Sequence, residues 1–127
     1  MPSIRSSKIL QAAAITGLLI MAGCSWDELE LEPLPQAVSF SSDIMPIFSA
    51  DCTAGCHSTG AIPPDLSAPN AYNVLMDDAM VNTLDPASSV LYVRMNETAS
   101  PMPPAGKLDQ NKVNLVLGWI EQGALDN

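Results

Sequence analysis

Residues 51–57 read DCTAGCH and bring together the only histidine of the chain and two of its three cysteines. The chain has 127 residues, which is room for one small domain. Only 5% of its residues are aromatic, and a small domain with so few large side chains usually needs a metal, a disulfide or a cofactor to hold it together. The segment 51–57 carries the side chains for such a cross-link, and we expect the fold to be organised around it.

The order of these side chains is typical of covalent haem attachment. The usual pattern is C-x-x-C-H, whereas Cys52, Cys56 and His57 form C-x-x-x-C-H, with one additional residue. Two thiols add across the vinyl groups of haem as thioethers, and the adjacent imidazole binds the iron as the proximal ligand. The three spacer residues are small, so a longer loop can bulge without contacting the porphyrin. The sequence therefore predicts one covalent haem c at these three residues.

Three other interpretations of the cluster stay open. Cys52 and Cys56 could form a disulfide in an oxidising envelope compartment. The cluster could instead bind zinc, although a closed structural site needs a fourth strong ligand and the chain has no second histidine. Chance clustering is the third interpretation.

A methionine thioether is a common second axial ligand of an electron-transfer haem. Met102 lies in the stretch SPMPPAG at residues 100–106, where three prolines restrict the backbone and favour an extended loop. Such a loop can hold a thioether in one place, so Met102 is the predicted distal ligand. Met95 is the second candidate, because it ends an expected helix just before this loop, and Met80 is the third. The other methionines lie in apolar patterns and are expected in the core.

With these motifs, most of residues 40–125 resembles the small mono-haem cytochromes c of membrane-tethered bacterial lipoproteins. Besides the haem motif, the resemblance rests on the stretches SDIMPIF (42–48), DPASSVLY (85–92), MPPAG (102–106) and WIEQGA (119–124). The three-residue spacer departs from the family pattern. The resemblance implies an all-α, cytochrome c-like domain of three to five helices around the haem, with His/Met axial ligands. It also implies an electron carrier and not an enzyme, although it could be a subunit of a redox enzyme or the donor to one.

The helix signals in the residues indicate the same layout. The expected N-caps are Ser42, Asn70, Asp85 and Asp109. Pro46 is expected near the start of the first helix, and Pro86 is expected at the first position of the third. The last helix has an apolar stripe and a glycine stop, formed by Val113, Val116, Leu117, Ile120 and Gly123. No convincing strand pattern and no repeat are visible.

Residues 1–24 resemble the signal sequence of a bacterial lipoprotein. Arg5 and Lys8 form a positive region, and about a dozen mostly apolar residues follow before two small residues and Cys24. The resemblance implies that residues 1–23 are removed and that Cys24 is lipidated, with Ser25 favouring the outer membrane. An ordinary signal peptide with an unrelated cysteine is the alternative. The expected location is the cell envelope, with the domain in the periplasm or at the surface and no transmembrane helix, because no apolar run reaches about 20 residues.

The rest of the chain divides into a tether and a domain. Residues 24–39 are expected to form an acidic, proline-containing tether, and residues 40–127 are expected to form the folded domain. Loss of Arg5 and Lys8 with the signal changes the formal charge from −9 to −11. This balance excludes nucleic acid as an expected partner, and it predicts docking to a basic patch on a redox partner protein. The lipid would confine that search to the membrane surface.

Two other functions are open at this point. If Met102 is not a ligand, five-coordinate iron could bind small gases, as in a haem-based sensor or ligand-binding module. If Cys52 and Cys56 are paired, the chain would be a haem-free structural lipoprotein of the envelope.

Three further positions have a functional and an ordinary interpretation. The carbonyl of Pro63 or Pro64 could accept a bond from the second nitrogen of the proximal imidazole. Arg94 could pair with a haem propionate, or it could be a solvated surface charge. Trp119 could pack at the edge of the haem, or it could be an ordinary core aromatic.

Overall fold

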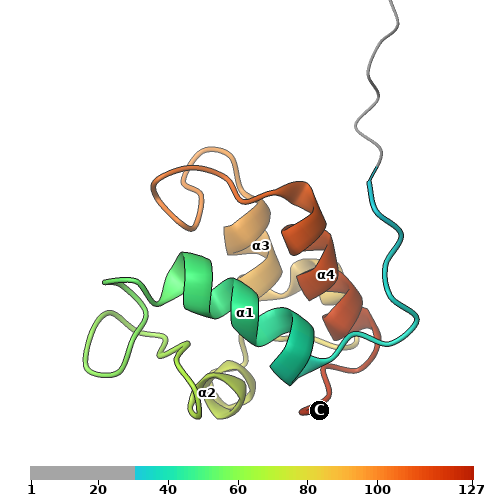
Figure 1. Ribbon diagram of the computed structural model, residues 1–127, viewed down its shortest axis with the longest axis horizontal. Helices are drawn as coiled ribbons and strands as arrows, with labels where there is room; N and C mark the ends of the chain where they lie inside the picture. The colour runs from blue at the N-terminus through green and yellow to red at the C-terminus, as the bar shows by residue number, and fades with distance from the viewer. Residues whose placement is uncertain (1–30) are drawn as a thin grey trace, which may run out of the picture. The chain divides into compact units, whose positions relative to one another are not determined.

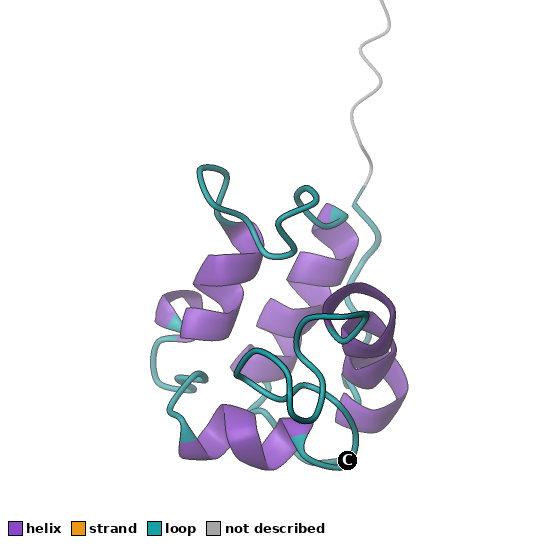
Figure 2. Cartoon of the chain, turned by 90° about the vertical axis from the view of Figure 1, so that its left-hand side faces the viewer, coloured by secondary structure: helices purple, strands orange, loops and turns teal. Residues whose placement is uncertain are grey.

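The computed structural model describes residues 31–127, which form helices and loops and contain no strand (Figure 1 and Figure 2). The helical elements of this part are η1 (Phe40–Ile44), α1 (Met45–Ile47), η2 (Phe48–Cys52), α2 (Ala71–Asp77), η3 (Pro86–Ser88), α3 (Val90–Asn96) and α4 (Gln110–Glu121). The expected all-α class is therefore confirmed for the described residues. The signal sequence expected over residues 1–23 and the lipidation candidate Cys24 lie outside them.

The elements η1, α1 and η2 join into one continuous helical segment, residues 40–52, which begins earlier than expected. The N-cap is Ser39 and not Ser42, because the Ser39 hydroxyl accepts the Ser42 N–H at 3.2 Å and the Asp43 carboxylate accepts the Ser39 N–H at 2.8 Å. Pro46 therefore lies in the middle of the segment, where its missing N–H interrupts the regular hydrogen-bond ladder. The wider turns of η1 and η2 on either side accommodate this interruption.

The expected caps of the two short helices do not act as caps. Asn70 occupies the N-cap position of α2, but its side chain donates to Asp65 at 2.8 Å instead of accepting a helix N–H. Asp85 precedes only the single turn η3, and α3 begins after Ser89, later than expected. Ser89 is buried and accepts the Asn82 N–H at 2.9 Å, and its extended backbone (ψ 129°) separates η3 from α3.

The last helix, α4, agrees with the sequence expectation at both ends. The Asp109 carboxylate accepts the Asn111 N–H at 2.8 Å, which confirms Asp109 as the N-cap. Gly123 follows the helix with φ +99°, and its N–H and the next one bond back into the last turn in a Schellman arrangement. Of the expected apolar stripe, Val113, Val116 and Ile120 are fully buried, whereas Leu117 is half-buried.

The first helical segment and α4 pack against each other in opposite directions (Figure 1). Beyond the C-terminal end of α4, the Asn127 side chain accepts the Phe40 N–H at 2.7 Å. Near the N-terminal end of α4, the Lys112 ammonium donates to the Asp51 carboxylate at 2.7 Å. These contacts join the beginning of the first segment to the end of α4, and the end of the first segment to the beginning of α4.

Trp119 lies in the core between these helices. Its side chain is buried, and its indole N–H donates to the Leu125 carbonyl at 2.9 Å. Its ring centroid lies 5.1 Å from that of Phe40 and 6.4 Å from that of Tyr72. Such a cluster is the usual environment of a core aromatic residue, and the ordinary interpretation of Trp119 accounts for all of these contacts.

Residues 31–38, which we call the strap, are packed along α4. The N–H groups of Glu32 and Val38 donate to side chains at opposite ends of the helix, at 3.3 and 2.8 Å. Leu34 packs on Gly118, where a Cβ would lie 3.0 Å from a leucine methyl group. Val38 is buried, so the core begins two residues before the expected start at residue 40. About half of the expected tether therefore belongs to the folded domain.

Two long loops extend to the same side of the helices. One loop joins η2 to α2 and contains Cys56, His57 and the prolines after them, directly following Cys52 at the end of η2. The other loop joins α3 to α4 and contains Met102. Figure 1 shows both loops on the left of the molecule, and residues of both line one cavity. The helices thus hold the two segments that carry the expected ligands next to each other.

Candidate functional site

The segment from Cys52 to His57 leaves the end of η2 and turns back on itself. The His57 N–H donates to the Cys52 carbonyl at 3.0 Å and closes a turn around the three-residue spacer. Gly55 has φ +84° in this turn, a left-handed conformation that favours glycine. Cys52 and Cys56 are free, half-buried thiols. The additional spacer residue is therefore accommodated by a turn whose shape favours glycine at position 55.

Replacing Gly55 by alanine is expected to destabilise this turn by about 1 kcal/mol, because a residue with a Cβ disfavours the left-handed conformation. Crowding is not the cause, since an added Cβ would meet no heavy atom within 4 Å. Gly123→Ala is the matched control, because Gly123 also has a positive φ and open space around it. Both variants should unfold at a lower temperature, but only Gly55→Ala should reduce the yield of covalently attached haem. Equal haem yields would show that the shape of the turn does not matter for attachment.

The His57 side chain is oriented by two backbone carbonyls. Its Nδ1 lies 3.1 Å from the Ile62 carbonyl oxygen and 3.2 Å from that of Pro64. With two acceptors beside it, we assign the ring proton to Nδ1, which leaves the Nε2 lone pair for a metal. Pro64 is one of the two prolines expected to supply such a carbonyl, whereas Ile62 was not identified from the sequence. No residue pattern marks a carbonyl acceptor, because every residue has one.

The loop that supplies these carbonyls is held by Asp65. Its carboxylate accepts bonds from the Thr59 hydroxyl at 2.9 Å, the Ser67 N–H at 3.0 Å and the Asn70 amide at 2.8 Å, and also from the Ser67 hydroxyl. The bonds from Ser67, followed by those from Asn70 and Thr59, hold the pKa of Asp65 well below its usual range. The Asn70 side chain is therefore used to fix this loop and not to cap α2.

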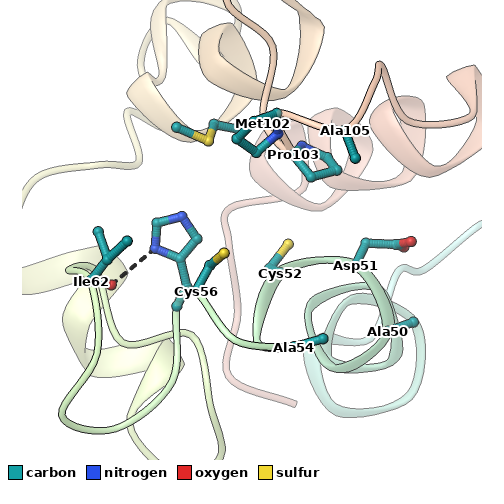
Figure 3. Close-up of a pocket in the computed structure, with 11 residues that line it drawn as sticks. Ala50, Asp51, Cys52, Ala54, Cys56, Ile62, Met102, Pro103 and Ala105 are labelled. Atoms are coloured by element: carbon teal, nitrogen blue, oxygen red, sulfur yellow. Dashed lines mark hydrogen bonds between the residues drawn. The ribbon is translucent and has the colours of Figure 1, made fainter.

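A cavity of about 540 Å³ lies between the two loops. It is lined by Ala50, Asp51, Cys52, Ala54, Cys56, His57, Ile62, Met102, Pro103, Pro104 and Ala105. Figure 3 shows Cys52 and Cys56 on one wall and Met102 on the opposite wall, and its dashed line is the bond between His57 and Ile62. All four predicted haem-binding side chains therefore line the same cavity.

A second, smaller cavity of about 220 Å³ also has Cys52, His57 and Met102 in its walls. Met80, Arg94 and Met95 line this cavity as well. Because the first three side chains border both cavities, the two spaces adjoin at the expected position of the iron ligands. A flat group bound between His57 and Met102 could therefore occupy parts of both cavities.

Met102 is held in place by α3. Its N–H donates to the Arg94 carbonyl at 3.0 Å, which ties the proline-rich loop to the helix that precedes it. Within the same loop, the Gly106 N–H donates to the Pro103 carbonyl at 3.2 Å. The thioether of Met102 is thus presented by a backbone that is bonded at two points.

The other methionines differ in their burial. Met95 is 3% exposed and Met80 is half-buried, and both line the smaller cavity but not the larger one. Met102 lines both, so the geometry favours it over the second and third candidates. Met76, which was expected in the core, is 38% exposed, because α2 is a short helix that buries Ala71 and Leu75 instead.

Two charged side chains influence Cys52. Its thiol pKa is raised to about 11, first by burial and then by the negative charge of Asp51, against a smaller opposite effect of Lys112. The thiol is therefore protonated at neutral pH. The Asp51–Lys112 ion pair was not identified from the sequence, because its members are separated by 61 residues and come together only in the folded chain.

The position of Arg94 is compatible with both of its interpretations, a partner of a haem propionate and a solvated surface charge. It lines the smaller cavity, as a partner of a bound anionic group would. Its guanidinium also pairs with Glu97 at 3.2 Å, and its side chain is 45% exposed. Exposed pairs of this kind contribute little to stability, so Glu97 does not hold Arg94 firmly in one position.

Comparisons with known proteins give no relative: no family model, no curated protein and no solved structure matches the chain. Within residues 31–127, no three side chains of His, Cys, Asp or Glu are grouped so that they could hold a metal ion. In the same part of the chain, no helix is long and apolar enough to cross a membrane.

Proposed function

We propose that this protein is a c-type cytochrome that carries electrons and is anchored to a membrane by a lipid. The observation that carries the proposal is the convergence of Cys52, Cys56, His57 and Met102 on one cavity from two segments that are distant in sequence. Two thiols, an imidazole and a thioether are the donor set that binds haem covalently and gives its iron two axial ligands.

The residues present fit such a group. The larger cavity has about 540 Å³, within the range of small-molecule and cofactor sites, and the smaller cavity adjoins it. The Nδ1 of His57 is bonded to backbone carbonyls, so Nε2 is the nitrogen left to bind iron. The Met102 loop is bonded to α3 from the other side.

The roles of the side chains follow from this arrangement. Cys52 and Cys56 would hold the macrocycle through thioethers, and His57 and Met102 would occupy the two axial positions. The bound haem would supply a one-electron Fe(III)/Fe(II) couple, and a thioether ligand raises its potential. With both His57 and Met102 bound to its iron, the haem would serve for electron transfer, so we propose a carrier and not an enzyme.

The strap limits how far the domain can lie from a lipid on Cys24. Only seven residue steps separate Cys24 from Leu31, and an extended chain of that length spans at most about 25 Å. The domain would therefore stay close to the membrane of the cell envelope, where its acidic surface would meet a redox partner with a basic docking patch.

The test is an absorption spectrum of the full-length protein, made with its own signal in a host that matures c-type cytochromes. We expect a sharp low-spin spectrum in the reduced form and haem that stays on the chain after extraction with acidified organic solvent. A colourless protein, or haem lost on extraction, would overturn the proposal and favour the disulfide or zinc interpretation of the cysteines.

A further inference from the structure

One member of a charged pair, Asp51, lines the larger cavity. Asp51 is in the last turn of η2, directly before Cys52, and lines the cavity. Figure 3 shows Asp51 on the same wall as Cys52, with its carboxylate turned away from the Cys52 sulfur atom. Its side chain is 23% exposed, so its charge is only partly screened by water.

The compensating charge comes from another part of the chain. Lys112 reaches from the first turn of α4 and places its Nζ 2.7 Å from an Asp51 carboxylate oxygen. Positively charged side chains are rare in the part that the structure describes. Its only lysine and arginine residues are Arg94, Lys107 and Lys112. Among the ion pairs of that part, Lys112–Asp51 joins two helices, whereas Arg94–Glu97 lies at the end of one.

The charges of Asp51 and Lys112 have opposite effects on a charged group in the cavity. Asp51 raises the pKa of the neighbouring Cys52 thiol, and Lys112 lowers it. A group in the cavity that gains or loses charge would be subject to the same two fields. The reduction of a ferric centre removes one positive charge, so an unpaired carboxylate on the wall would oppose it and an unpaired ammonium would favour it.

We infer that Lys112 prevents the Asp51 carboxylate from lowering the redox potential of the site, as a positioning residue that holds and neutralises this carboxylate at the cavity wall. The inference rests on the proposed function, since it concerns a haem attached at Cys52. It gives a role to the ion pair that joins Lys112 of α4 to Asp51 of η2.

The test compares midpoint potentials of the haem-loaded protein in three variants. Lys112→Met should lower the potential, Asp51→Asn should raise it, and the double variant should lie between them and close to the unaltered protein. Both single shifts should become smaller as salt rises, because the pair is partly exposed. Glu121→Gln is the control: it removes one exposed negative charge at the far end of α4, about 13 Å further along the helix, and should leave the potential nearly unchanged.

The outcomes separate the inference from the proposed function. Haem content and the low-spin spectrum are measured first in every variant, so that a lost ligand is not mistaken for a charge effect. Single variants that keep the spectrum but shift in the same direction, or no more than Glu121→Gln, would overturn the inference and leave the cytochrome proposal intact. Absence of covalent haem from the unaltered protein would overturn both.

Discussion

Serine at both Cys52 and Cys56 is expected to give a protein from which acidified organic solvent extracts all of the haem. The two thiols are the only cysteines in the described residues and both line the cavity, so no other thioether can form there. The measurement is the fraction of haem that stays with the chain after extraction. We expect this fraction to fall from nearly all to none, while each single variant keeps one thioether and retains haem.

Cys24→Ser is the matched control, because it removes the third cysteine of the chain by the same substitution. It should leave the haem attached but release the protein from the membrane fraction, since the lipid would be lost. Haem that remains on the double variant would show that attachment does not use these thiols. Haem that is lost from Cys24→Ser would contradict the separation of the anchor from the haem-binding domain.

Replacing Met102 by alanine is expected to remove the distal ligand and change the spectrum from low-spin to high-spin. The side chain lines both cavities, whereas Met80 and Met95 line only the smaller one, so we expect neither of them to take its place. The variant should bind carbon monoxide rapidly in the reduced form, and its potential should fall, because the thioether favours the reduced state. Visible spectra and a redox titration measure both effects.

Met80→Ala and Met95→Ala are the controls for this variant. Both residues line only the smaller cavity, and Met95 is buried, so Met95→Ala should cost about 2–5 kcal/mol of stability yet keep the low-spin spectrum. If Met95→Ala or Met80→Ala gives the high-spin spectrum and Met102→Ala does not, Met102 is the wrong ligand. If the unaltered protein already binds carbon monoxide rapidly, the site is five-coordinate and the gas-binding alternative is favoured.

The sequence predicted α4 better than the other helices. Asp109 as the N-cap and Gly123 as the stop are local signals, because each depends on hydrogen bonds within about one turn of the same helix. Ser42, Asn70 and Asp85 were poorer predictions. Asn70 donates to Asp65 in the preceding loop, and Ser39 takes the N-cap position by accepting the N–H of Ser42. Partners outside the expected helices therefore decided these two positions.

In the candidate site, too, the local features were predicted from the sequence and the long-range contacts were not. Cys52, Cys56 and His57 are adjacent in the chain, so their identity as one cluster needs no fold, and the proline-rich stretch alone sets Met102 apart from the other methionines. The structure added the Ile62 carbonyl behind His57 and the Asp51–Lys112 pair. Neither has a local pattern, because a carbonyl acceptor can belong to any residue and an ion pair across 61 positions exists only after two helices have packed.

The amino-acid sequence by itself thus determined the helical class, the ends of α4 and the residues that we propose for haem binding, since each of these depends on side chains a few positions apart. The tertiary structure decided that Met102 and the cysteines line one cavity, that the strap belongs to the domain and that a lysine of α4 is paired beside Cys52. These features need segments from distant parts of the chain to be packed together. Their stability comes from the buried core between the first helical segment and α4, and no short stretch of sequence contains that information.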